Sequence, residues 1–341
     1  MVVRLDPEVW KPPMLGYIAR RVVTLIPTLF AISVITFIVM ELPPGDYLTT
    51  YVAQLAAQGG ETVEGSQLAS LRAQYGLDQP IYIRYLKWMG QVLQGDLGNS
   101  FDWRRPVSYL IQQRIGWSLL IGVSTLLLTW VIAFPIGIYS AVRQYSIGDY
   151  AATLFGFIGI AIPEFLLALV LMWIAFAYFG QSVGGLFSSQ YLDAPWSAGK
   201  LLDLLGHLWI PLILIGLNHT AGLIRTMRAN LLDELHRAYV VTARAKGLPE
   251  WKVILKYPVR VALNPFVSTV GWALAAVLSG EAIVSQVLNL PTLGPLQLRA
   301  VLSQDMFLAG SIVMFLAVFT VLGTLLSDIL LAVLDPRIRL Q

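Results

Sequence analysis

Uncharged apolar segments recur along the chain at lengths that suit membrane-spanning helices. An α-helix rises about 1.5 Å per residue, so about 20 apolar residues cross the hydrocarbon core of a bilayer. Six segments meet or approach this length: residues 22–40, 119–142, 150–178, 208–224, 261–287 and 306–334. The pattern predicts an all-α integral membrane protein with six transmembrane helices.

Some of these segments contain residues that are unusual in hydrocarbon. Pro163 and Glu164 interrupt the third, Asn218 and His219 lie in the fourth, and Glu281 lies in the fifth. A carboxylate at the centre of a bilayer is costly, about 2.5–3.5 kcal/mol on insertion scales, so these side chains should face the bundle interior or a cavity. They are candidates for a translocation path. Structural roles are the alternative: a helix–helix hydrogen bond, a gate, a subunit interface or a position near the outer surface of the membrane.

The connections between the predicted spans differ greatly in length. Residues 41–118 are too many for a simple loop, because connections above about 15 residues usually carry structure or function. Helix-like pieces at 65–75 and 80–94 favour a small external domain there. The remaining segments outside the spans include an N-terminal segment 1–21, a charged connection 225–260 and a tail 335–341.

Lysine and arginine are distributed unevenly among these connections. Fifteen of the 23 lie in residues 1–21, 143–149, 225–260 and 335–341, whereas the short connections on the other side hold only Lys200 and Arg299. Short connections rich in Lys and Arg remain in the cytoplasm, and long loops count little in this rule. Both termini and residues 225–260 are therefore expected in the cytoplasm, and residues 41–118 outside.

Composition supports the membrane class and limits the chemistry. Only 13 % of residues are charged and 57 % are hydrophobic, whereas a soluble domain carries roughly 25 % charged residues. The chain has no cysteine, and its three histidines do not have metal-ligand spacing. It also lacks a P-loop and any catalytic Ser/His/Asp, paired-carboxylate or zinc-protease spacing. We expect a protein that is not an enzyme and holds no cofactor or metal.

The charged connection contains a stretch, 239–252, with the pattern helix, stop, helix. Lys246 followed by Gly247 is typical of a helix C-terminus, and Pro249 with Glu250 suits the first turn of a new helix. The sharp reversal favours positive φ at Gly247. Ala243 and Gly247 are four residues apart, so they share a helical face that would let another surface approach closely. The alternative is a solvated loop with ordinary caps.

These residues resemble a known family. The stretches Arg225-x-x-Arg228, Tyr239-Val240-x-Thr242-Ala243-Arg244-Ala245-Lys246-Gly247-Leu248 and Asn264-Pro265 are similar to the cytoplasmic "EAA" region of binding-protein-dependent ABC importer permeases, and most of all to the peptide/nickel group. Further matches run through nearly the whole chain, among them Pro44-Gly45-Asp46, Gly95-Asp96-Leu97-Gly98 and Asp335-Pro336-Arg337. The glutamate that names the motif is replaced by Val241.

The resemblance implies a mechanism and a set of partners. The residues around the motif would form a coupling helix that docks on a separate ATPase: Thr242, Ala243, Arg244, Ala245, Lys246, Gly247, Leu248 and Glu250. A second, similar permease forming a heterodimer, two ABC ATPases that bind ATP and Mg, and an external solute-binding protein would complete an importer of di- or oligopeptides in the cell membrane. No nucleic acid is expected as a partner. The alternatives are import of nickel chelates, oligosaccharides or another small solute, and, further away, a secondary transporter or channel; the absence of an internal repeat disfavours the latter.

Overall fold

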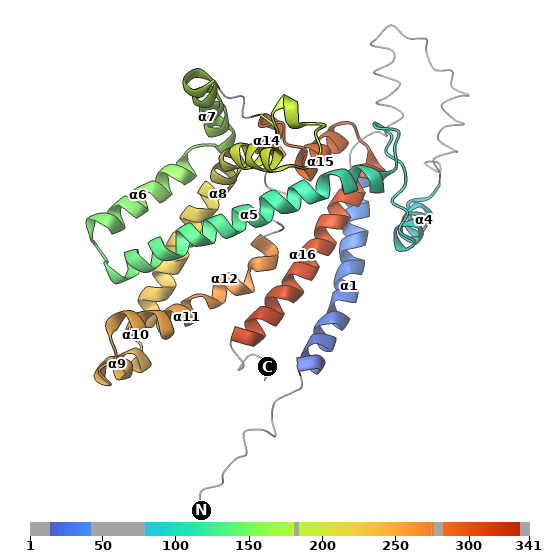
Figure 1. Cartoon of the computed structure of the whole chain (residues 1–341). Helices are drawn as coiled ribbons and strands as arrows, with labels where there is room; N and C mark the ends of the chain where they lie inside the picture. The colour runs from blue at the N-terminus through green and yellow to red at the C-terminus, as the bar shows by residue number, and fades with distance from the viewer. Residues whose placement is uncertain (1–13, 42–78, 181–183, 274, 276–281, 335–341) are drawn as a thin grey trace, which may run out of the picture.

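The computed structural model describes residues 14–41, 79–180, 184–273, 275 and 282–334. Within these ranges the regular elements are helices, apart from one isolated bridge between Asn99 and Pro106 (Figure 1). Four helices are long and apolar enough to cross a membrane, and a fifth candidate is a bent pair of helices. The expected sixth span and the side on which each end lies remain predictions.

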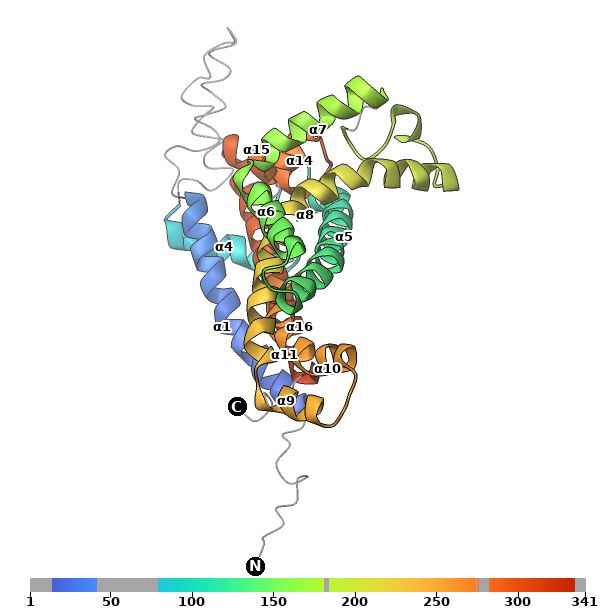
Figure 2. The ribbon, with the colours of Figure 1, turned by 90° about the vertical axis from the view of Figure 1, so that its left-hand side faces the viewer.

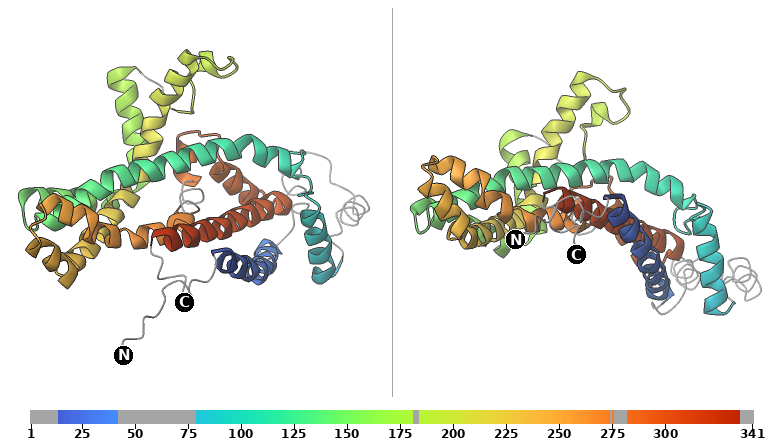
Figure 3. Two further views of the ribbon diagram at one scale, coloured as in Figure 1. Left: turned by 60° about the horizontal axis from the view of Figure 1, so that its bottom comes forward. Right: turned by 90° about the horizontal axis from the view of Figure 1, so that it is seen from below.

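Three of the long helices are α1 (Met14–Glu41), α5 (Val107–Val142) and α16 (Met306–Leu334). Figure 3 shows α16 lying between α1 and α5. The helix α5 begins at Val107, before the predicted start of the second span at residue 119, because Pro106 supplies its N-cap position and no proline lies between 107 and 119. Proline suits this position because its missing N–H would be unpaired at a helix start.

The fourth long helix, α8 (Ala198–Leu235), crosses α5 at close range. A Cβ placed on Gly137 of α5 would lie only 2.7 Å from Cβ of Met227 on α8. Glycine therefore permits this contact, and a larger residue would push the two helices apart. The helix α8 also extends beyond the predicted fourth span at both ends, because Ser197 caps its start and the charged residues from Arg225 onward continue the helix.

The predicted third span is divided into two helices. The first, α6 (Ile147–Ala161), and the second, α7 (Glu164–Phe179), meet at a bend of 99°. Ile162 is extended, with φ −93° and ψ 124°, and Pro163 follows it. Residues before proline avoid helical backbone, and proline itself lacks a donor, so the helix must break here. Residues 150–178 are therefore not one straight helix.

The predicted fifth span is described only in pieces. The short helices α11 (Pro258–Ala262) and α12 (Asn264–Ser268) precede it or lie within it, and α14 (Ala282–Val287) ends it. Residues 274 and 276–281 lie outside the described residues. The helix α15 (Leu293–Leu302) follows where only a short link was expected.

The two ends of the molecule carry different elements. The start of α1, the end of α16 and the helices α9 (Ala238–Ala245) and α10 (Glu250–Lys256) lie toward one end (Figures 1 and 2). The opposite end carries α4 (Ile81–Leu93), α14, α15 and a short 3-10 helix (Ser189–Tyr191). The first group is the set expected in the cytoplasm, and α4 confirms the helix-like piece seen at residues 80–94.

Candidate functional site

The stretch 239–252 forms two short helices, α9 and α10, joined by a sharp reversal; together they are called the hairpin below. The helix α9 ends at Ala245, and the N–H of Gly247 donates to the carbonyl of Arg244 at 2.9 Å. Gly247 has φ +74°, in the left-handed region that glycine adopts readily. Pro249 caps α10 from outside, so the second helix begins at Glu250 and not at the proline. The predicted helix–stop–helix pattern and the positive φ at Gly247 are confirmed.

Apolar side chains hold α9 and α10 together. Val240, Ala243 and Val253 form a buried cluster, and Tyr257 packs against it. Ala243 is only 5 % exposed. Its small side chain therefore allows α9 and α10 to approach each other closely. The expected outward-facing surface made by Ala243 and Gly247 together is not formed, because the hairpin uses the small residue for its own packing.

An ion pair crosses the reversal from one helix to the other. Nη2 of Arg244 lies 2.7 Å from Oε1 of Glu250, and Nε lies 3.1 Å from the same oxygen. The hydrogen bonds from Arg244 lower the pKa of Glu250, and those to Glu250 raise the pKa of Arg244. Sequence analysis included both residues among the candidate coupling residues but did not predict that they form an ion pair.

The outer surface of this hairpin carries exposed apolar side chains. Such groups at the end of a protein mark contact sites when they cluster. The most exposed are Val241 (56 %), Trp251 (62 %) and Leu255 (53 %), and Leu248 is 37 % exposed. Thr242, Ala245 and Lys246 are exposed as well. The inner side chains of the hairpin are thus buried within this chain, whereas its outer apolar side chains are exposed.

The hairpin is joined to the long helices through a second apolar cluster. Ile254 of α10 packs with Met227 and Leu231 of α8, together with Val259 and Phe266 from the following segment. Tyr239 donates a hydrogen bond to the carboxylate of Glu234 near the end of α8. Burial and this acceptor raise the pKa of Tyr239 to about 12. The hairpin is therefore attached to the C-terminal part of α8 by apolar packing and by one hydrogen bond.

Next to this cluster lies an ion pair that sequence analysis missed. Arg228 on α8 donates from Nε and Nη2 to the two carboxylate oxygens of Asp149, at 2.9 Å each. Asp149 is in the first turn of α6, with its side chain 4 % exposed. It also accepts from the N–H of Tyr145 at 2.9 Å, and its own N–H donates to Ser146. The only signal in the sequence was the position of Arg228 in the Arg-x-x-Arg pattern.

The candidate path residues are not gathered into one cluster. Pro163 and Glu164 lie at the bend between α6 and α7, while Asn218 and His219 are exposed on α8. In the described part of the chain, no hydrogen bond or ion pair joins these side chains to each other or to another group. Glu281 lies outside the described residues. Among the described residues, Asn218 and His219 therefore have no partner for the helix–helix hydrogen bond that was the alternative to a path role.

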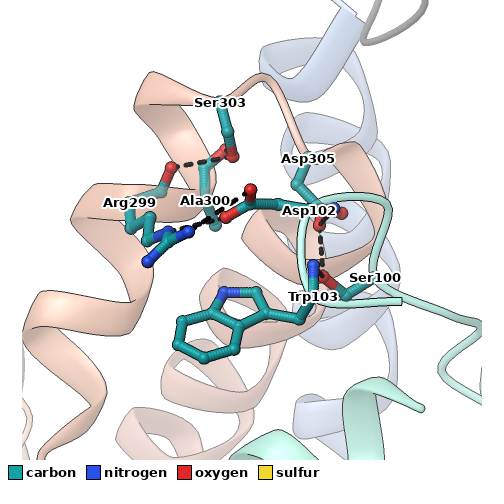
Figure 4. Close-up of polar contacts among 7 residues, drawn as sticks. All are labelled: Ser100, Asp102, Trp103, Arg299, Ala300, Ser303 and Asp305. Carbon is teal, nitrogen blue, oxygen red and sulfur yellow. Dashed lines mark hydrogen bonds and ion pairs between the residues drawn. The ribbon is translucent and has the colours of Figure 1, made fainter. Parts of the chain in front are cut away.

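A polar cluster at the opposite end fixes the segment before α5 (Figure 4). Asp305 is fully buried and accepts from the hydroxyl of Ser100 at 2.5 Å and from the N–H groups of Asp102 and Leu308 at 3.1 and 3.2 Å. Burial raises its pKa, and these hydrogen bonds partly offset the effect. Residues 98–106 are thereby fastened to the junction of α15 and α16.

The rim of this cluster is charged and aromatic. Nε of Arg299 lies 2.7 Å from a carboxylate oxygen of Asp102, and its guanidinium carbon lies 4.6 Å from the ring centroid of Trp103. Ser303, one helical turn later, donates to the carbonyl of Arg299 at 2.9 Å (Figure 4). Because the side chain of Arg299 is 59 % exposed, this outer pair is more accessible than the one between Asp149 and Arg228.

The chain is similar along nearly its whole length to known transport proteins. Residues 133–340 match the family described as "Binding-protein-dependent transport system inner membrane component", and residues 14–121 match the N-terminal part of such components. The chain is 35 % identical to the oligopeptide transport system permease protein AppB of Bacillus subtilis, over 96 % of this chain and all of that protein. It is 30 % identical to the OppB permease of Salmonella typhimurium and 29 % to that of Haemophilus influenzae, over the same shares.

The matched ranges include both the long helices and the α9–α10 hairpin. The apolar helices agree with a position in the membrane, and the hairpin holds the motif that suggested the resemblance. The chain is a multi-pass cell-membrane protein, and it belongs to the family of inner-membrane permease components of binding-protein-dependent transport systems.

Proposed function

We propose that this chain is the permease subunit of an ABC importer that moves di- or oligopeptides into the cytoplasm, with ATP hydrolysed by separate subunits. The observation that carries the proposal is the α9–Gly247–α10 hairpin in a chain similar over 96 % of its length to oligopeptide permeases. The hairpin is packed internally, yet it exposes Leu248, Trp251 and Leu255. A partner protein with an apolar groove would cover them.

The coupling residues have separable roles in this proposal. Thr242, Ala245, Lys246 and Leu248 form part of the docking surface because they are exposed. Ala243, Arg244, Gly247 and Glu250 set the shape of the hairpin through packing, the ion pair and the left-handed turn. Docking on an ATPase therefore requires the second group even where its members do not touch the partner.

The assembly in this proposal contains two ATPases, a second permease of similar sequence and an external solute-binding protein. The hairpin, the start of α1 and the end of α16 face the cytoplasm, and the end that carries Asp305 faces outward. Exposed apolar side chains along α6 and α7, such as Phe155 (71 %) and Phe176 (69 %), are suited to contact with lipid or with the second permease.

The substrate path in this proposal runs along the bend at Pro163. We assign Glu164, Asn218, His219 and Glu281 to this path, with Glu281 meeting the charged amino group of the peptide. Glu281→Gln should then reduce uptake of peptides with a free amino terminus more than uptake of N-acetylated peptides. Equal reduction of both, together with lower abundance of the protein, would show that Glu281 is structural.

The proposal is tested by isolating the chain from its host with an affinity tag. Two ATPases and a second permease should co-purify, and the complex in proteoliposomes should accumulate labelled peptides when ATP and binding protein are present. Nickel chelates and oligosaccharides serve as competing substrates. A tagged chain that transports alone, or a complex that accumulates one of the competitors and no peptide, would refute the proposal.

A further inference from the structure

The ion pair between the buried Asp149 and the partly exposed Arg228 lies where three parts of the molecule meet. Asp149 is at the start of α6, directly after the turn that ends α5, and Arg228 is on α8. Met227 and Leu231, on the same turn of α8 as Arg228, belong to the buried cluster that also contains Ile254 of α10 and Val259 of α11. The helix α11 packs on both α8 and α10, so this turn of α8 is joined to the hairpin through the apolar cluster and to α6 through its charged side chain.

The geometry of this pair suits the transmission of movement. The guanidinium and the carboxylate make two parallel hydrogen bonds of 2.9 Å, which fix both distance and orientation. The carboxylate is further held by the N–H of Tyr145, and the N–H of Asp149 is held by Ser146. If either helix slid along the other, these two hydrogen bonds would break and the buried carboxylate of Asp149 would lose its charged partner.

We infer that Asp149 and Arg228 are positioning residues that make the α5–α6 turn move as one body with α8 and the α9–α10 hairpin. The inference rests on the proposed function, because it assigns the movement to ATPase closure acting on the hairpin. In this arrangement the apolar cluster carries movement from α10 to α8, and the ion pair carries it from α8 to α6 and α5. Neither residue belongs to the docking surface or the substrate path assigned above.

Replacing both charges by amides tests this role without leaving one charge buried alone. Asp149→Asn with Arg228→Gln keeps similar side-chain sizes, and removing both members of a buried pair is often tolerated. Arg228→Lys is a second variant that keeps the charge and loses the forked geometry. The control is Arg21→Gln with Asp328→Asn, which removes an ion pair between α1 and α16 with Nε and Oδ2 3.2 Å apart; neither helix contributes to the apolar cluster that joins α10 to α8.

The first measurement compares hydrolysis with transport in proteoliposomes of the full complex. We expect the double variant to keep its ATPases and its basal hydrolysis while stimulation by peptide-loaded binding protein falls by about tenfold, within the range of typical coupling between distant sites. Uptake per ATP hydrolysed should fall with it. Arg228→Lys should lie between wild type and double variant, and the control should match wild type.

The second measurement asks directly whether the two parts move together. The chain contains no cysteine, so Gln144→Cys in the α5–α6 turn and Lys256→Cys at the end of α10 give two specific labelling positions, both exposed. The distance between nitroxide labels should stay constant in the wild type when ATP is added, and should change or broaden in the double variant. A structural role alone would lower abundance and basal hydrolysis together and leave this difference absent.

The outcomes separate the inference from the proposal on which it rests. Wild-type stimulation and a constant label distance in the double variant would overturn the inference, even if its ATPases bind. Loss of the complex in the double variant, with Arg228→Lys behaving as wild type in both measurements, would also overturn it. Failure of the wild-type chain to bind any ATPase would instead overturn the proposed function.

Discussion

Arg244 and Glu250 join the two helices of the hairpin across Gly247, with Nη2 and Oε1 2.7 Å apart. Both side chains are about half exposed, so the pair itself stabilises the hairpin by about 0–1 kcal/mol. Its effect is geometric: a forked donor fixes the orientation of α10 relative to α9. Gly247 and the ion pair therefore both determine the angle between α9 and α10, and their contributions can be tested separately.

Substitutions at Gly247 should separate backbone conformation from side-chain bulk. Apart from its two chain neighbours, a Cβ at this position would meet no atom of the described residues within 4 Å, so the strain there arises from the positive φ. Gly247→Val should lose about 1–2 kcal/mol or more, whereas Gly247→Asn should lose less, because asparagine tolerates left-handed backbone. Uptake and stimulated ATPase activity should be low in the first variant and close to wild type in the second. Equal activity in both would mean that the turn conformation does not matter for coupling.

Enlarging Ala243 should damage the hairpin itself. Because Ala243 is packed against Val240 and Val253, Ala243→Leu overfills the cluster at a cost of about 1–3 kcal/mol. Ala245→Leu adds the same bulk to an exposed position two residues later and serves as the control. Limited proteolysis should cleave the first variant rapidly after Arg244 or Lys246 and the second at the wild-type rate. Slow cleavage of Ala243→Leu would contradict the packing described here.

The Arg244–Glu250 pair should make the hairpin sensitive to acid. The pKa of Glu250 in the folded protein is lowered from its ordinary value of 4.5, so the stabilisation is fully present above that value. It is lost as the pH falls through the lowered pKa, when the carboxylate takes up a proton. Nitroxide labels at Ala245→Cys and Lys252→Cys should therefore report a wider distance distribution in acid. Glu250→Gln should give that distribution at every pH, and a wild-type distribution that never widens would rule the idea out.

Asp305 should matter far more for stability than Asp102, the partly buried acid beside it that pairs with the exposed Arg299. Asp305→Ala leaves the Ser100 hydroxyl and two buried N–H groups unpaired, at about 1–3 kcal/mol for each group. Asp102→Asn weakens an exposed pair worth about 0–1 kcal/mol. Thermal unfolding followed by fluorescence in detergent should show a large drop in melting temperature for the first and a small one for the second. Similar values for the two variants would argue against Asp305 as the central acceptor of the outer cluster.

Local signals in the sequence predicted the hairpin well. Glycine and proline act on their own neighbours, so Lys246-Gly247 and Pro249-Glu250 were enough to indicate two helices and a turn with positive φ. Apolar length likewise indicated the long helices, but not their ends. The start of α5 and both extensions of α8 depend on caps and on the absence of breakers, which hydropathy does not report.

Long-range pairing could not be predicted in the same way. Asp149 and Arg228 are 79 positions apart, and Ser100 and Asp305 are 205 positions apart, so only the packing of the helices brings them together. The helix α15 was missed although Leu293, Leu296 and Ala300 are buried at the spacing of one helical face. That signal was present in the sequence, but the short apolar run was treated as a link.

The length of α5 has a mechanical consequence. Its 36 residues run from the segment held by Asp305 to the turn held by Arg228, a distance of about 54 Å at the usual helical rise. A rigid arm of that length magnifies small angles, since a tilt of about 5° about one end displaces the other by about 5 Å. Pro135, inside the helix, removes one backbone hydrogen bond and is a site where the arm can bend. If α5 stays straight at Pro135, a change in its tilt at the end near the hairpin displaces the end near Asp305. If α5 bends at Pro135, that displacement is smaller.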